Sequence, residues 1–133
     1  MKHSKVLKGI LFVCGFIIAL AGIVALSSPA YFTARNGIDI TGNLSLFNDY
    51  RSMGGLLLGT GIITLLGVIH SRMTFTSTVV AAVMYSTFSF GRILSIVLDG
   101  MPAEGIVKAT VVETVLALVA IFALAKYRDV ENS

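Results

Sequence analysis

The sequence has little of what soluble domains and metalloenzymes are built from. It has no tryptophan, one cysteine, two histidines and two prolines in 133 residues, and only 13% of its residues are charged. A single cysteine excludes an internal disulfide bond, and the Cys/His set of a transition-metal site is missing. Soluble domains carry about 25% charged residues, so the low charge argues against a soluble fold.

Apolar residues make up 56% of the chain, and its mean hydropathy is +0.90. They fall into four blocks, each close to the roughly 20 residues that a membrane-spanning helix needs. The blocks are residues 6–26, 53–69, 75–98 and 105–124. They predict an all-α membrane protein, a four-transmembrane-helix bundle that forms one domain over residues 1–133.

The basic residues indicate how the spans are oriented. Six of them fall on one side of a four-span topology, Lys2, Lys5, Lys8, Arg72, Lys126 and Arg128, whereas Arg35 and Arg51 fall on the opposite side. The positive-inside rule then places both termini in the cytoplasm. This placement also explains the net charge of +3, and nucleic-acid binding is not expected without a basic face on a soluble module.

The longest connection, residues 27–50, lies on the opposite side of the membrane and is expected to form a short extracytoplasmic cap. Residues 38–46 alternate apolar and polar side chains about Gly42-Asn43. Such alternation around a turn predicts a small β-hairpin over the helix ends.

Small residues indicate where helices approach closely. Gly15 and Gly22 form a stripe on the first span, and Gly55 and Gly59 form a GxxxG pair on the second. We favour packing of this pair inside the bundle over packing between copies. The small unit leaves much side surface, so we also expect a homo-oligomer, either a dimer or a trimer.

Charged residues within the spans are the most specific feature, because an ionisable group in a bilayer costs at least ~3 kcal/mol and is normally paired or functional. Arg92 lies roughly 9 Å and Glu113 roughly 12 Å from the same membrane surface, at 1.5 Å per residue. Helices joined by a short turn are neighbours, so the two side chains are expected to meet.

We expect a polar pocket that opens to the non-cytoplasmic side. Arg51 and Arg92 would form its walls and Glu113 its floor. One face of the third span would add further polar groups, and other residues would lie at the mouth. The added groups are Tyr85, Ser89 and Ser95, and the mouth residues are Asn48, Asp49 and Asp99.

Three interpretations of this pocket remain open. The first is a non-enzymatic protein that holds a lipid or another amphiphile, since arginine suits phosphate and carboxylate groups. The second is a purely structural Arg92–Glu113 ion pair, and the third is a small proton-coupled exporter that uses Glu113. An enzyme is not expected: Ser89 and Ser95 have no nearby base other than Glu113, and no metal or cofactor motif is present.

Two runs carry a family resemblance: Tyr50-Arg51-Ser52-x-Gly54-Gly55 and Gly91-Arg92-x-x-Ser95-x-x-x-Asp99-Gly100-x-Pro102, followed by Glu113 in the last span. They resemble the bacterial four-span family known as domain of unknown function four-three-four-five, over nearly the whole chain. The resemblance implies a small bacterial inner-membrane protein with a role in cell-envelope integrity and no assigned reaction.

Overall fold

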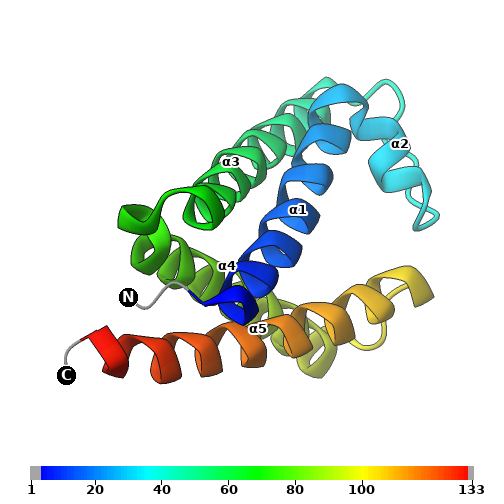
Figure 1. Cartoon of the computed structure of the whole chain (residues 1–133). Helices are drawn as coiled ribbons and strands as arrows, with labels where there is room; N and C mark the ends of the chain where they lie inside the picture. The colour runs from blue at the N-terminus through cyan, green and yellow to red at the C-terminus, as the bar shows by residue number, and fades with distance from the viewer. Residues whose placement is uncertain (1–3, 132–133) are drawn as a thin grey trace.

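The protein consists of helices that run between two ends of the molecule. The computed structural model describes residues 4–131, so Lys2 lies outside the described residues. In chain order these residues form α1 (Lys5–Ser27), α2 (Pro29–Ala34), α3 (Leu44–Ile69), the 3₁₀ turn η1 (Ser71–Met73), α4 (Thr74–Asp99) and α5 (Glu104–Glu131) (Figure 1). Both chain ends lie at one end, the terminal end; α2 and the α4–α5 turn lie at the other, the distal end (Figure 1).

The predicted fold class is confirmed. Helices α1, α3, α4 and α5 are each long and apolar enough to cross a membrane, and residues 4–131 contain no strand. The protein is therefore an all-α, multi-pass membrane protein. Predicted spans 6–26 and 75–98 match α1 and α4 to within one residue at each end, whereas α3 begins earlier and α5 ends later than the apolar blocks.

The β-hairpin predicted at residues 38–46 is wrong. Asn43 instead caps α3, because its Oδ1 accepts a hydrogen bond from the Leu46 N–H (3.1 Å). An asparagine N-cap satisfies a helix donor that has no partner within the helix, whereas an isolated hairpin is marginally stable. In the preceding turn the Thr41 N–H donates to Asp39 Oδ1 (2.9 Å), which lowers the pKa of that carboxyl. The connection therefore consists of α2 and a turn-rich loop.

Small residues bring α1 and α3 into close contact. A Cβ atom on Gly22 would lie 2.5 Å from the backbone N of Leu58, and one on Gly61 would lie 2.7 Å from the backbone N of Ala19. A Cβ atom on Gly15 would meet a leucine side chain of α3 at 2.8 Å. Such close backbone approach is how membrane helices gain packing energy. Gly15 and Gly22 both lie at this contact.

The interior packing predicted for Gly55 and Gly59 is wrong. Both residues are exposed, and a Cβ atom on either would meet nothing within 4 Å. The α3 glycines that face α1 are Gly54 and Gly61, whose separation of seven residues keeps them on one side of a helix. The GxxxG pair therefore lies on the surface of α3 that faces away from α1.

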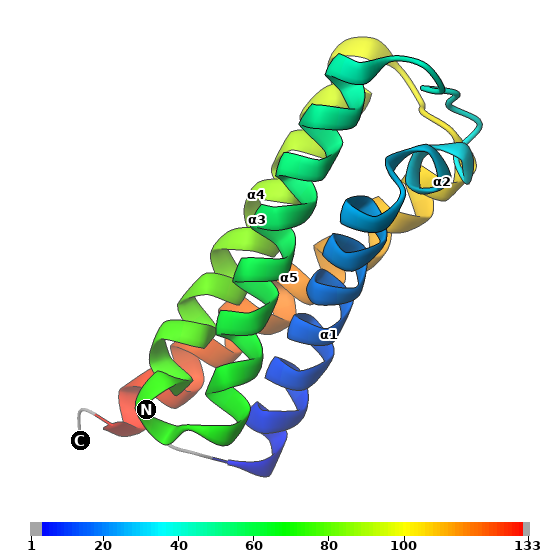
Figure 2. The same ribbon diagram turned by 90° about the horizontal axis from the view of Figure 1, so that it is seen from above.

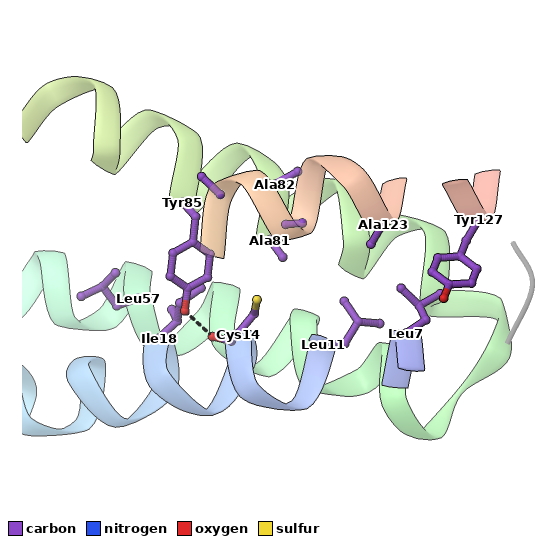
Figure 3. Packing of buried hydrophobic residues seen from close by; sticks show 12 residues of the cluster. Leu7, Leu11, Cys14, Ile18, Leu57, Ala81, Ala82, Tyr85, Ala123 and Tyr127 are labelled. Atoms are coloured by element: carbon purple, nitrogen blue, oxygen red, sulfur yellow. Dashed lines mark hydrogen bonds between the residues drawn. The ribbon is translucent and has the colours of Figure 1, made fainter. Parts of the chain in front are cut away.

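The helices form two layers that share a core toward the terminal end. α1 packs on α3 in one layer and α4 on α5 in the other, and from above one layer lies over the other (Figure 2). Their buried side chains meet between the layers (Figure 3), among them Leu7, Leu11, Cys14, Ile18, Ala81, Ala82, Tyr85, Ala120, Ala123 and Tyr127. The Tyr85 hydroxyl donates to the Cys14 carbonyl oxygen (2.7 Å) and so ties α4 to α1.

Toward the distal end the two layers diverge (Figure 1). No residue of α4 beyond Ser89 is buried, and none of α5 before Thr110 is buried. Within the described residues α3 and α5 do not contact each other. The loop after α2 crosses to the start of α5, where the Asn36 side-chain oxygen lies so close to Gly105 that a Cβ atom there would clash. Residues 90–99 of α4 and 104–109 of α5 therefore add no buried residue to the shared core.

Replacing Tyr85 by phenylalanine is expected to lower the free energy of unfolding by about 1 kcal/mol, because one interhelical hydrogen bond in a membrane is worth about that much. Thermal unfolding in one detergent would measure the change, with Tyr31→Phe on the exposed face of α2 as the control. An unchanged midpoint for Tyr85→Phe would show that the bond to Cys14 contributes no net stability.

Candidate functional site

An ion pair joins α4 and α5 within their membrane-spanning segments. Arg92 Nε donates to Glu113 Oε2 (2.5 Å), and Arg92 Nη2 donates to Glu113 Oε1 (3.3 Å). A two-bond, charge-assisted contact of this kind fixes both side chains in one geometry. The side chains are 30% and 19% exposed, respectively. The contact predicted from their matched depth is therefore present.

The ion pair faces the region where the layers diverge. Arg92 follows Tyr85 by seven residues and Glu113 precedes Ala120 by seven, a separation that returns to the same helix face. Tyr85 and Ala120 both belong to the core shared with α1. Arg92 and Glu113 thus continue the core-facing sides of α4 and α5 toward the distal end. Arg92 lies beyond Ser89, the last buried residue of α4, whereas Glu113 lies one turn from the buried Thr110 on α5.

Two hydroxyl groups link α4 and α5 beside the ion pair. Ser89 Oγ and Thr114 Oγ1 lie 2.6 Å apart, and Thr114 Oγ1 also donates to the Thr110 carbonyl oxygen (2.8 Å). A hydroxyl has a single proton to donate, so Ser89 is the donor to Thr114. Ser89 therefore lies next to the pair, as predicted, but its proton is already engaged by α5.

The remaining residues that were predicted on the polar face of α4 do not lie beside the ion pair. Tyr85 is buried in the core and bonded to the Cys14 carbonyl, so it closes the terminal side of the site and does not line a polar pocket. Ser95 Oγ donates to Asp99 Oδ2 (3.3 Å), and both residues are exposed in the last turns of α4. This face of α4 therefore runs from Tyr85 in the core to Asp99 at the distal end, and Arg92 lies between them.

Arg51 lies apart from the ion pair. Its Nε donates to the Leu26 carbonyl oxygen near the end of α1 (3.0 Å), and its guanidinium lies 5.8 Å from the centroid of the Phe47 ring. The single pocket with Arg51 and Arg92 on its walls is therefore wrong. The physical reason is that Arg51 is held near the end of α1, whereas Arg92 lies beyond Ser89 on α4, toward the end where the two layers diverge.

Arg51 instead belongs to an open surface groove of about 400 Å³ at the start of α3, lined by Leu44, Phe47, Asn48, Arg51 and Ser52. Asn48 thus accompanies Arg51 and not Arg92. Asp49 is exposed on the same turn of α3, and Asp99 is bonded to Ser95 on α4. The predicted mouth of one pocket is divided between two helices of different layers.

Arg92 retains hydrogen-bonding capacity after it pairs. A guanidinium has five N–H donors, and Glu113 accepts one from Nε and one from Nη2, which leaves three. No other partner of Arg92 occurs among the residues that the structure describes. These donors are therefore available to an acceptor from outside the chain.

The site offers a guanidinium and a carboxylate, which supply charge and hydrogen bonds. In the described part of the chain, no group of three or more His, Cys, Asp or Glu side chains is arranged to hold a metal ion. A family model described as "Domain of unknown function (DUF4345)" matches residues 6–124. The chain belongs to this family. No curated protein and no solved structure matches it significantly.

The DUF4345 match spans Arg51, Arg92 and Glu113 and confirms the resemblance drawn from the sequence. Thr110 and Thr114 of this DUF4345 protein were not among its predicted site residues, although both lie on the helix face of Glu113. The signal that identifies them is their separation of four residues, which places one hydroxyl a turn away from the other. Phe47 and Ser52 of the Arg51 groove were also not among the predicted site residues, and no pattern in the sequence identifies them.

Proposed function

We propose that this protein is a non-enzymatic membrane protein that holds a lipid or another amphiphile, with the ligand's polar group at Arg92 and Glu113. The observation that carries the proposal is the partly exposed, two-bond ion pair inside the membrane-spanning segments. Arg92 has three donors left for an external acceptor. Phosphate and carboxylate oxygens are the acceptors that a guanidinium fits best.

The position of the pair supports an amphiphile over a water-soluble ligand. Arg92 is seven residues from the end of α4 at Asp99, or about 10 Å along the helix axis. At that depth a ligand must place apolar groups in the hydrocarbon around its polar group. Phe88 and Leu116, one turn closer to the terminal end, are half-buried against the core, and they offer apolar surface for acyl chains that run toward the bilayer centre.

We further propose a bacterial inner membrane with both termini in the cytoplasm. The terminal end carries Lys5, Lys8, Arg72 and Lys126, and cytoplasmic loops of membrane proteins are enriched in such residues. The site then opens toward the periplasm, where retention of lipid would contribute to cell-envelope integrity. The outward GxxxG pair of α3 supports self-association as a dimer or trimer, because small residues allow helices of two copies to approach closely.

Native mass spectrometry of gently extracted protein tests the function. Wild type is expected to retain lipid in a fixed ratio to the chain, whereas Arg92→Met/Glu113→Met is expected to lose it. This double variant removes both charges together, so no buried charge is left unpaired. The matched control is Glu104→Met/Lys108→Met, which removes the exposed ion pair of α5 and is expected to retain lipid.

The two-bond geometry also favours a second candidate, a purely structural pair that fixes the register of α4 and α5. Under that alternative the Arg92→Met/Glu113→Met variant would retain the same lipid as wild type, or neither protein would retain any. Either result would overturn the proposed lipid-holding function.

A further inference from the structure

We propose that the Arg92–Glu113 site selects a zwitterionic headgroup that combines a primary ammonium with a phosphodiester, as in phosphatidylethanolamine. This inference rests on the proposed function and names the chemical class of its ligand. Its basis is that two opposite charges, held together by two hydrogen bonds, are both partly exposed on the same side of the molecule.

The first step is the charge of the site. Arg92 and Glu113 sum to zero, and electrostatic interactions are strong where water is scarce. A headgroup with only a negative charge gains from Arg92 but is repelled by the carboxylate that lies 2.5 Å from Arg92 Nε. A headgroup with only a positive charge meets the reverse problem. A zwitterion places each of its charges opposite the complementary side chain.

The second step is hydrogen bonding. Arg92 has three donors left, which match phosphodiester oxygens. Each Glu113 oxygen accepts one bond from Arg92 and has lone-pair capacity for a second. A primary ammonium has N–H donors for that capacity, whereas a quaternary ammonium has none. The site therefore favours an ethanolamine over a choline headgroup of equal charge.

The third step is that neighbouring groups do not change the zero net charge of the site. The Ser89 hydroxyl donates to Thr114 Oγ1 and the Thr114 hydroxyl donates to the Thr110 carbonyl, so they offer no competing donor. Asp99 follows Arg92 by seven residues, is exposed and accepts from Ser95. Lys108 pairs with Glu104 on the exposed surface of α5. The neutral pair is thus the local determinant of headgroup charge.

The test uses full-length protein in bilayer discs that contain phosphatidylethanolamine, phosphatidylcholine and phosphatidylglycerol in equal amounts, followed by native mass spectrometry. Wild type is expected to retain the ethanolamine lipid about tenfold more than either other lipid, the ratio that one charge-assisted hydrogen bond provides. Glu113→Gln leaves Arg92 as an unbalanced cation, so its preference is expected to shift to phosphatidylglycerol. Glu104→Gln, at an exposed glutamate of the same helix, is expected to keep the wild-type preference.

Retained lipid that mirrors the disc composition, or that favours phosphatidylglycerol in wild type, would overturn the headgroup inference and leave the lipid-holding function intact. Absence of retained lipid from all discs would overturn both. The comparison of ethanolamine with choline lipid uses wild-type protein alone, so it decides the inference even where Glu113→Gln does not fold.

Discussion

Removal of one member of the Arg92–Glu113 pair is expected to destabilise the protein by about 3–5 kcal/mol, because the charge that remains loses its partner in a low-dielectric environment. This loss applies to Arg92→Met and to Glu113→Met. The double variant is expected to recover most of it, since apolar side chains of similar length replace a buried pair at little net cost. Denaturant-induced unfolding of the four proteins in one detergent measures both effects.

The control for these variants is Lys108→Met, which breaks an ion pair whose two side chains are exposed on α5. Exposed pairs contribute little to stability, so its midpoint should equal that of wild type. If Arg92→Met unfolds at the wild-type midpoint, water must solvate Glu113 fully, and the site would be open to bulk solvent. The unfolding of these variants therefore also reports how far water reaches the ion pair.

Leucine at Gly22 or Gly61 is expected to separate α1 from α3 and to lower the free energy of unfolding by about 3 kcal/mol, the upper range for overpacking a close contact. A Cβ atom alone would already lie 2.5 Å from a backbone atom at Gly22 and 2.7 Å from one at Gly61. Leucine at Gly55 or Gly59 is expected to leave the unfolding of the single chain unchanged, because nothing lies within 4 Å of either position.

Thermal unfolding of the four glycine variants in detergent separates these cases. A large loss at Gly55 and none at Gly22 would show that the helices pack through the GxxxG pair, contrary to the structure. The same four proteins examined by size-exclusion chromatography test the proposed self-association. A smaller assembly for Gly55→Leu or Gly59→Leu, with an unchanged unfolding midpoint, would place those residues between copies.

The sequence was sufficient to predict contacts that depend on neighbouring helices. Arg92 and Glu113 lie on spans joined by a short turn, so counting residues from that turn fixes their relative depth, and the helical repeat fixes their faces. The four spans followed from apolar length alone. Each of these predictions depends on one helix or on one short connection, where geometry leaves few alternatives.

Apart from the interior packing of Gly55 and Gly59, the predictions that failed were those that required the long connection. Arg51 was placed with Arg92 because both approach the same membrane surface, but depth does not determine which helices touch. The close fit of Gly22 and Gly61 pairs α3 with α1, and Arg51 bonds to the end of α1 instead of joining Arg92. Similarly, the alternation at residues 38–46 suited a strand, but Asn43 supplied a helix cap and extended α3 to Leu44.

The contact between Asn36 and Gly105 limits how the two layers move relative to each other. The layers are fastened at the terminal end by their shared core, so relative motion amounts to pivoting about that core. At the distal end the loop after α2 spans the layers and lies against the first turn of α5. A steric contact of this kind opposes closer approach, so this loop resists a narrower angle between the layers. A narrower angle than the one observed requires Asn36 to move away from Gly105 first.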